Sequence, residues 1–525
     1  MPLFPVSDLA LAGLNNDLIP SVMPASFLTS CTNARSVSGG IAPFGGFSVV
    51  AEFPDDSVPC DMLYVDSATT KVWYFPCEDK VYQYEATFVD VSPAGMINVG
   101  DGTKWTSTDL SGIAVINHPA IGPMYMSESD DKFIPLPFKS GEDWPTANQG
   151  CDIIVAHKQF LFALGVTNDG KYVPDSIRWS APADIGSIPP TWDELDVTQT
   201  AGYTTLGGSG GAIIGAKPLR DALCIYRSQG ITIVDYVGGT YVWRIRHLTS
   251  NSGLISNNAV VDVNGTHYYL SDGDVMKNDG NSITSIATRR IKKRMQAINK
   301  EQYRKSYAVH NPLNNEILFC VPDANSEYPN VAYVYNYNND SWFSRELPMH
   351  VKSEYGLTNK EQVDWDHIQT DWDGWDSSWD NDATSPYDKA VLSIVAPVID
   401  SDPDKSTKAK IIGLTSILGL NTEPFSSIIE RTDLLIGDLS RTTTVQRVYP
   451  HIQGSGTVMI QIGSQQAPGG QILWKPPCEF NPNVDRKIDM RTTGILHAYR
   501  VYADSITTSF LFSGIDFQYV EAGSR

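Results

Sequence analysis

Four short strand patterns follow one another between residues 306 and 346, and this stretch constrains the fold more than any other. Ser306–His310 and Glu316–Val321 flank a turn rich in Asn, and Val331–Asn336 is rich in β-branched and aromatic residues. After a second Asn-rich turn, Trp342 opens the fourth pattern. Four antiparallel strands in about forty residues form a sheet that cannot bury its own faces, which is typical of a β-propeller blade.

The same pattern recurs upstream. Corresponding strands are spaced by roughly 45–55 residues, which predicts a propeller of roughly six to eight four-stranded blades. The two clearest repeats contain turn signals such as Asn264-Gly265 and Gly238-Gly239 between their strands. Their predicted strands are Ala212–Gly215, Ala222–Arg227, Thr232–Tyr236 and Tyr241–Ile245, then Val260–Val263, Thr266–Leu270, Val275–Lys277 and Ile283–Ile286.

We therefore expect an all-β fold in three parts. Residues 1–40 form an N-terminal arm, and residues 41–435 form the propeller. The strand pattern changes after residue 436, so residues 436–525 are expected to form a smaller C-terminal β-domain resembling a sandwich. An acidic insertion interrupts the propeller at residues 361–388.

Cysteine usage and the N-terminus bear on where the chain is made. The seven cysteines are scattered through the 525 residues, so we expect reduced core thiols and no disulfide framework. The first eleven residues lack a basic region typical of a signal peptide, and no run of eighteen apolar residues occurs. We expect a chain folded in a cytoplasm that does not span a membrane by helices.

The formal net charge is −21, which argues against general affinity for nucleic acids, but one segment is basic. Eight lysines and arginines lie between residues 287 and 305, in a segment predicted to contain a short helix. Two interpretations stay open: contact with DNA phosphates or an acidic neighbouring subunit, or a solvated connector between blades. The candidate contact residues are Arg289, Arg290, Lys292, Lys293 and Arg294.

The acidic insertion has a repeated composition in which four tryptophans are each followed by Asp. Three closely spaced carboxylates in it raise the alternative of a calcium site, but the segment lacks the spacing and the distant Glu of a helix–loop–helix site. The other interpretation is a solvated acidic loop. The candidate residues are Trp365, Asp371, Trp372, Asp373, Trp375, Asp376 and Trp379.

No motif indicates catalysis. The run Gly207–Gly211 precedes Lys217, but Pro218 follows that lysine and strands flank it, so we expect a flexible loop in place of a phosphate site. The nine histidines are isolated, which makes metal ligation improbable. We expect no catalytic, cofactor-binding or metal-binding residues, and no enzyme.

Several of these stretches resemble the tail nozzle (packaged-DNA stabilisation) proteins of short-tailed bacteriophages. The resemblance covers about residues 150 to 350 and the C-terminus, and it lies in blade signatures. The stretches are Ile177–Pro182 with Trp192-Asp193, Gly215–Tyr226 leading into Tyr236–Gly239, Asn251–Ser256, Leu270–Asp274, the blade at 306–346, and Phe512–Asp516.

The resemblance implies a ring, usually of six copies, that lies below the head-to-tail adaptor protein and forms the DNA exit channel. Such a ring also contacts tail fibres or spikes and a plug, and it belongs to the virion tail assembled in the bacterial host cytoplasm. Six copies would carry roughly −126 charges, and an acidic lumen would let double-stranded DNA slide. The Trp/Asp insertion is then expected at an exposed end, at a lumen constriction or against a partner.

A second function of another class also fits a propeller. It is a carbohydrate-binding or carbohydrate-hydrolysing protein, an adhesin or a glycosidase, in which tryptophans of the insertion stack on sugars. A ring with an axial channel supports the nozzle, whereas a monomer that retains or hydrolyses polysaccharide supports the alternative.

Overall fold

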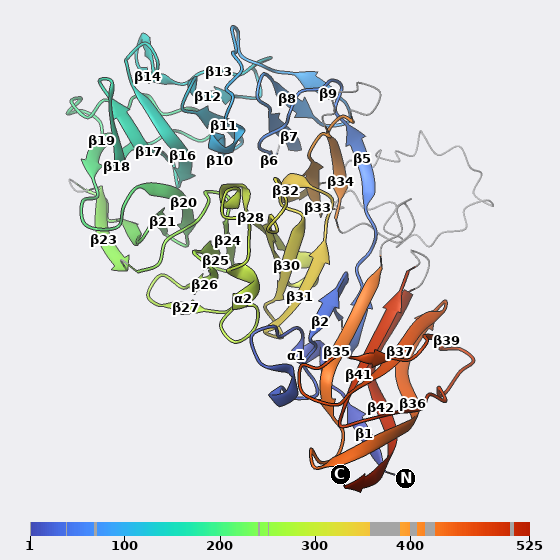
Figure 1. The fold of residues 1–525 in the computed structure, drawn as a ribbon. Coiled ribbons are helices and arrows are strands. Elements are labelled where there is room, and N and C mark those ends of the chain that lie inside the picture. Colours follow the sequence, from blue (N-terminus) through green and yellow to red (C-terminus); the bar gives the residue numbers. More distant parts are fainter. Residues whose placement is uncertain are drawn as a thin grey trace, which may run out of the picture.

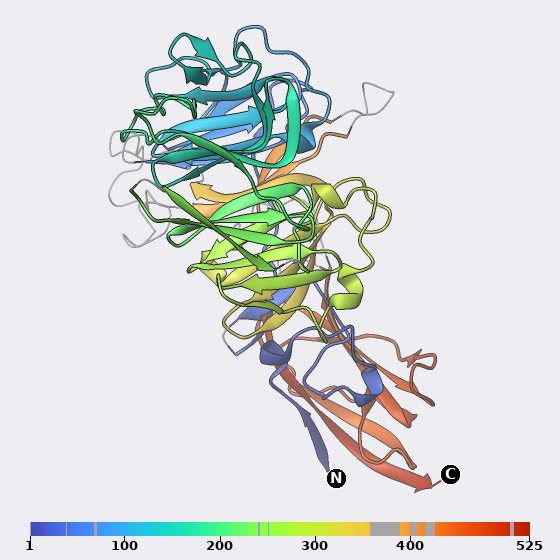
Figure 2. The ribbon, with the colours of Figure 1, turned by 90° about the vertical axis from the view of Figure 1, so that its left-hand side faces the viewer.

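The structure is a computed structural model that describes residues 2–37, 39–67, 71–239, 242–249, 251–357, 389–398, 407–414, 426–504 and 509–524. Over these residues β-strand is the dominant regular structure, and the two α-helices, α1 (Leu9–Ala12) and α2 (Lys292–Met295), span four residues each. The predicted all-β fold is confirmed. A propeller forms one end of the molecule and a second β-domain forms the other (Figure 1, Figure 2).

The described strands form seven four-stranded blades, within the predicted range. The first three blades are β6 (Leu63–Asp66), β7 (Lys71–Pro76), β8 (Val81–Tyr84), β9 (Phe88–Asp90); β10 (Thr106–Leu110), β11 (Ile113–His118), β12 (Gly122–Met126), β13 (Ile134–Pro135); and β16 (Gly150–His157), β17 (Phe160–Asn168), β18 (Lys171–Trp179), β19 (Gly202–Thr205). A short hairpin, β14 (Pro137–Lys139) and β15 (Glu142–Asp143), lies between the second and third blades.

The next three blades continue in chain order, and the predicted turn signals lie at their hairpins. Asn264 and Gly265 both adopt positive φ in the first hairpin of the fifth blade, as an Asn-Gly turn requires. These blades are β20 (Ile213–Leu219), β21 (Ala222–Arg227), β22 (Ile231–Tyr236), β23 (Trp243–Thr249); β24 (Val260–Val263), β25 (Thr266–Ser271), β26 (Asp274–Asn278), β27 (Ile283–Ser285); and β28 (Tyr307–Asn311), β29 (Glu316–Val321), β30 (Val331–Asn336), β31 (Ser341–Glu346).

The seventh blade closes the ring with a strand from the beginning of the chain. β32 (His350–Leu357), β33 (Lys389–Val395) and β34 (Lys410–Gly413) are completed by β5 (Ser48–Glu52), which pairs antiparallel with β34. The first strands of consecutive blades contact one another around the ring, and the last, β32, contacts the first, β6. The propeller is therefore a closed ring.

The connections between strands divide between the two faces of the propeller. Antiparallel pairing places the turns after the first and third strands of every blade at one face, here called the first-turn face. The turns after the second strand and the links to the next blade lie at the opposite face, here called the crossover face. Short links, such as residues 347–349 between β31 and β32, keep the first strands of successive blades in the same direction.

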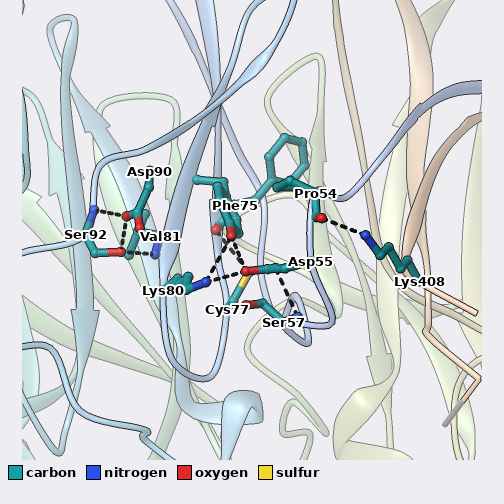
Figure 3. Close-up of polar contacts among 11 residues, drawn as sticks. Pro54, Asp55, Ser57, Phe75, Cys77, Lys80, Val81, Asp90, Ser92 and Lys408 are labelled. Atoms are coloured by element: carbon teal, nitrogen blue, oxygen red, sulfur yellow. Dashed lines mark hydrogen bonds and ion pairs between the residues drawn. The ribbon is translucent and has the colours of Figure 1, made fainter. Parts of the chain in front are cut away.

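A polar cluster fastens the closing strand to the first blade (Figure 3). The Asp55 carboxylate, just after β5, accepts hydrogen bonds from the Tyr82 hydroxyl at 2.7 Å and from the Lys80 ammonium. Desolvation alone would raise the pKa of Asp55, but these hydrogen bonds hold it well below its usual range. Lys408 Nζ, ahead of β34, donates to the Pro54 carbonyl at 2.6 Å. The contacts of Asp55 with Lys80 and Tyr82, here called the latch, therefore hold the closing strand of the seventh blade against the first blade.

The second domain consists of two sheets that pack face to face. Tyr499 lies between them, with its ring centroid 6.4 Å from Phe512 and 5.9 Å from Phe517. One sheet contains β1 (Leu3–Val6), β3 (Ala34–Val37), β4 (Gly40–Pro43), β36 (Arg441–Ser455), β40 (Thr492–Gly494) and β42 (Ser509–Ser524). The other contains β2 (Ser30–Thr32), β35 (Ser427–Leu435), β41 (Leu496–Ala503), β37 (Val458–Gln465), β38 (Leu473–Trp474) and β39 (Cys478–Phe480).

The second of these sheets is continuous with the sixth blade of the propeller. Its strand β2 pairs parallel with β31 at Thr32 and Ser344 and antiparallel with β35, so that ten strands form one sheet. The Ser344 hydroxyl donates to the Cys31 carbonyl at 2.7 Å, and the Asn33 amide donates to the Ser344 carbonyl at 2.8 Å. The blade at 306–346 is therefore the one that bears the second domain.

Two parts of the chain pair differently from the predicted domain bounds. The predicted arm, residues 1–40, supplies β1, β2, β3 and the start of β4 to the two sheets of the second domain. β35, which lies inside the predicted propeller range of 41–435, pairs with β2 and β41 and belongs to no blade. Strand periodicity specifies a pleated surface and leaves the partner strand undefined, which is why both differences arose.

A buried cationic cluster fills the joint between the propeller and the second domain. The Arg345 guanidinium donates to two backbone carbonyls at 2.7 and 3.1 Å and lies over the Phe44 ring at 4.7 Å. Arg35 of β3 lies 3.7 Å from the Glu316 carboxylate of β29. Each domain thus supplies polar partners to the other, so neither face of the joint is complete alone.

The cysteines and the helices agree with the sequence expectations. All seven cysteines are free thiols, and five of them are buried. Burial raises the pKa of Cys224 and Cys320 to about 12, so neither forms a thiolate at neutral pH. No helix in the described residues is long and apolar enough to cross a membrane.

Candidate functional site

The first strands of the blades enclose a cavity of about 460 Å³ near the propeller axis. A DNA duplex, whose major groove alone is about 12 Å wide, does not pass through a space of this size. The lining mixes apolar side chains and backbone with a few ionisable groups. The acidic and basic residues of the lining are Asp109, Lys217, His310, Lys352 and Glu354.

One buried ion pair lies at this axis, between the seventh and first blades. Lys352 Nζ on β32 donates to Asp61 Oδ1 at 2.5 Å and to the Met62 carbonyl at 3.0 Å. The Asp61 side chain is 2 % exposed, and its other oxygen accepts a hydrogen bond from the Ser107 hydroxyl at 2.7 Å. These contacts therefore connect three blades near the axis. Lys352 lies on β32 of the seventh blade, Asp61 precedes β6 of the first, and Ser107 lies on β10 of the second.

The remaining ionisable groups of the cavity are shifted towards their neutral forms. Burial raises the pKa of Glu354 to about 7, and its Oε2 has no hydrogen-bond partner in the described residues. Burial lowers the pKa of Lys217, which has no carboxylate within ion-pair distance in that same part of the chain. Burial also lowers the pKa of His310, whose Nε2 lies 3.2 Å from the Tyr337 hydroxyl. Burial therefore disfavours the charged forms of Glu354, Lys217 and His310.

The basic segment lies in the link from the fifth to the sixth blade, on the crossover face, and contains α2 as predicted. The Asp17 carboxylate accepts hydrogen bonds from the backbone amides of Lys292 and Lys293 at 3.1 and 2.9 Å. Lys292 Nζ lies 2.6 Å from Asp274, and Arg290 donates to a backbone carbonyl at 2.9 Å. Of these two side chains, Arg290 therefore binds the N-terminal residues, through the Ala12 carbonyl, and Lys292 binds within the propeller.

The other candidate cations of this segment project outward. Arg289, Lys293 and Arg294 are exposed, and so is Lys300 further along. Lys293 Nζ reaches only the Asp17 backbone carbonyl, at 2.9 Å. In the described residues no carboxylate lies within ion-pair distance of these four side chains. The structure thus divides the five candidates by burial, which the sequence alone left as one group. Arg290 and Lys292 are half-buried, whereas Arg289, Lys293 and Arg294 are exposed.

The acidic insertion and all seven of its candidate residues lie outside the described residues. Its flanking strands β32 and β33 pair with each other, with Leu357 opposite Lys389, so the insertion leaves and re-enters the seventh blade at the first-turn face. Metal binding by the insertion stays a prediction. Elsewhere in the described ranges, no group of three or more His, Cys, Asp or Glu side chains is arranged to hold a metal ion.

The glycine-rich run before Lys217 is a structural loop, as predicted. Gly207, Gly208 and Gly211 adopt positive φ. The Arg227 guanidinium donates to the carbonyls of Gly207 and Gly211 at 2.6 and 2.8 Å. A phosphate loop directs amide N–H groups inward, whereas this loop directs carbonyl oxygens at a cation.

Sequence reasoning missed the ionisable side chains of the cavity. Lys352 and Glu354 are two residues apart in β32, and strand periodicity places them on one face. That alternation was a usable signal, but the partner Asp61, which precedes β6, lies 291 residues away in the sequence. Pairing over such separations depends on ring closure, which no local pattern encodes.

Comparisons with known proteins add a distant likeness of fold. No family model and no curated protein matches this sequence. An extracellular domain described as part of a one component system of B. thetaiotaomicron superposes with a TM-score of 0.40 and 9% identity, over 82% of this chain and 47% of that chain. The AfRom2 CNH domain superposes with a TM-score of 0.36 and 9% identity, over 70% and 98%. The chain thus spans about half the length of the first structure, and scores this low carry no argument about function.

Proposed function

We propose that this chain is a structural virion protein, the subunit of a tail nozzle that forms a DNA exit channel, retains packaged DNA and guides its ejection. The observation that carries the proposal is the ten-stranded sheet that runs from the sixth blade into the second domain. The two domains cannot hinge within this sheet without breaking its backbone hydrogen bonds. Such a connection would suit a wall that confines DNA under pressure.

The small cavity at the propeller axis bears on where a channel would lie. Because the axial cavity is about 460 Å³ and is lined by Lys352, which binds Asp61, DNA would pass between copies and not through a propeller. The sequence resemblance supplies the ring, usually of six copies. The net charge of −21 per chain favours a lumen along which the phosphate backbone slides without sticking.

The proposed partners follow from the same resemblance. They are further copies of this chain, the head-to-tail adaptor protein, tail fibre or spike proteins, a plug, and the double-stranded DNA that passes through. The protein would reside in the virion tail after assembly in the bacterial host cytoplasm. This role needs rigid surfaces and no active site.

The oligomeric state of the purified chain tests this proposal. One chain has a mass of 57.7 kDa, so a six-membered ring would have a mass of about 346 kDa. We expect mass photometry to detect this species and negative-stain images to show a ring with an axial channel. A chain that stays monomeric at every concentration and retains or hydrolyses polysaccharide would instead be the carbohydrate-active propeller.

A further inference from the structure

A long acidic connection lies on the first-turn face of the third blade. Residues 180–201, here called the acidic loop, join β18 to β19 and contain four acidic residues and no lysine or arginine. Loops of this length are commonly functional when they are held in one conformation. In this protein, side chains of the loop itself hold it against the propeller.

Buried anchors fix the acidic loop to the body of the propeller. The Trp192 side chain is fully buried, with its ring centroid 4.9 Å from Trp144. The Trp192 amide also donates to the Phe138 carbonyl at 2.8 Å. Glu194 lies 3.2 Å from the buried Arg178 guanidinium. The loop therefore presents a defined surface.

That surface displays apolar side chains beside its carboxylates. Val197, Ile185 and Leu195 are 96%, 81% and 81% exposed, more than any other large apolar side chain in the described residues. Asp184 and Asp196 lie next to them in sequence. Apolar groups rimmed by charge are typical of a surface that binds another protein.

The crossover face carries a surface of complementary composition. Its cations Arg289, Lys293, Arg294 and Lys300, here called the basic patch, are exposed and lack carboxylate partners in the described part of the chain. The N-terminal segment that Asp17 binds to α2 continues into Ile19 and Val22, which are 64% and 73% exposed, and its residues 20–22 contact β35.

We propose that the acidic loop of one copy binds the basic patch of the next copy, with Leu195 and Val197 packing against Ile19 and Val22. This inference rests on the proposed ring and names its interface. The two surfaces lie on opposite faces of the propeller, so one copy binds two different neighbours at once. Such a head-to-tail contact closes into a ring when its rotation permits.

Charge reversal tests the interface directly. The first variant combines Lys293→Glu, Arg294→Glu and Lys300→Glu, which makes both surfaces acidic. The second combines Asp184→Lys, Asp196→Lys and Gln199→Lys, which makes both surfaces basic. For each variant alone, we expect the protein concentration needed for assembly to rise at least about tenfold, because like charges meet at every contact.

An equimolar mixture of the two variants is expected to assemble again, with the copies alternating around an even-numbered ring. Matched controls reverse exposed charges away from both surfaces. Glu128→Lys with Asp131→Lys lies on the same face as the acidic loop, and Arg486→Glu lies in the second domain. Both controls are expected to assemble like the wild type, as measured by mass photometry.

The possible outcomes separate this inference from the proposed function. A wild-type ring that persists in both variants would overturn the interface and leave the nozzle standing. A wild-type chain that never assembles would overturn both. If the first variant assembles normally but loses binding to a short double-stranded DNA probe, the basic patch is a nucleic-acid surface and the proposed contact is wrong.

Discussion

Lys352 and Asp61 bind each other at 2.5 Å on the propeller axis, where the Asp61 side chain is 2 % exposed. Replacing Lys352 by Met leaves a buried carboxylate without its cation, which typically destabilises a protein by about 3–5 kcal/mol. We therefore expect Lys352→Met to unfold at a lower urea concentration than the wild type, as monitored by tryptophan fluorescence.

The control for this variant is Lys139→Met, because the Lys139–Glu142 pair is 43% and 48% exposed. Exposed pairs contribute below about 1 kcal/mol, so this midpoint should hardly move. Adding Asp61→Asn to Lys352→Met should recover part of the loss by removing the unpaired charge. Equal midpoints for Lys352→Met and Lys139→Met would show that the axial pair is not buried as described.

Glu354 makes the stability of the propeller depend on pH. Burial raises the pKa of Glu354 from 4.5 to about 7, so the folded state holds this proton more tightly than the unfolded state. The free energy of unfolding therefore falls as pH rises from about 4.5 through about 7, by at most about 3 kcal/mol from this group.

The variant Glu354→Gln removes this dependence. Relative to the wild type it should gain stability between pH 5 and pH 8, as measured by the difference in thermal midpoints at each pH. A difference that stays constant over this range would mean that Glu354 is ionised throughout in the folded protein.

Among the strands, the closing strand β5 is held by side chains as well as by its ladder with β34. Asp55→Ala leaves Lys80 and Tyr82 without their shared acceptor, at a cost of about 1 kcal/mol in a partly exposed site. We expect faster amide hydrogen exchange in β5 and β34, while exchange in β42 is unchanged. Asp279→Ala is the matched control, because the Asp279 carboxylate accepts only within its own turn. Equal exchange in the two variants would exclude the latch.

The strands also show that local sequence pattern predicts strand bounds but not every strand pairing. Predicted Glu316–Val321 and Val331–Asn336 coincide with β29 and β30, because turn residues and β-branched runs mark both ends. The ladder of β2 with β31 and β35 was not predictable, because three residues carry no periodicity that names a partner. The same limit holds for the candidate site. The basic segment and α2 were predicted, whereas the contacts of Arg290 with Ala12 and of Lys292 with Asp274 are tertiary and leave no local signal in the sequence.

At the scale of the whole molecule, a closed seven-bladed ring and a sandwich share one ten-stranded sheet. The sequence predicts repeated four-stranded sheets followed by a smaller domain, but a shared sheet requires the two ends of the chain to meet in space. That meeting places Arg345, Phe44 and Glu316 in one buried joint. The propeller and the second domain are therefore joined by a shared sheet and by buried side chains.

The most direct test of this account is a cryo-EM reconstruction of the purified chain with double-stranded DNA present. We predict a ring of copies in which the lumen lies between subunits, the axial cavity of each propeller stays closed, and the second domain continues the sixth blade without a hinge. Isolated monomers at all concentrations, or DNA density along a propeller's own axis, would contradict it.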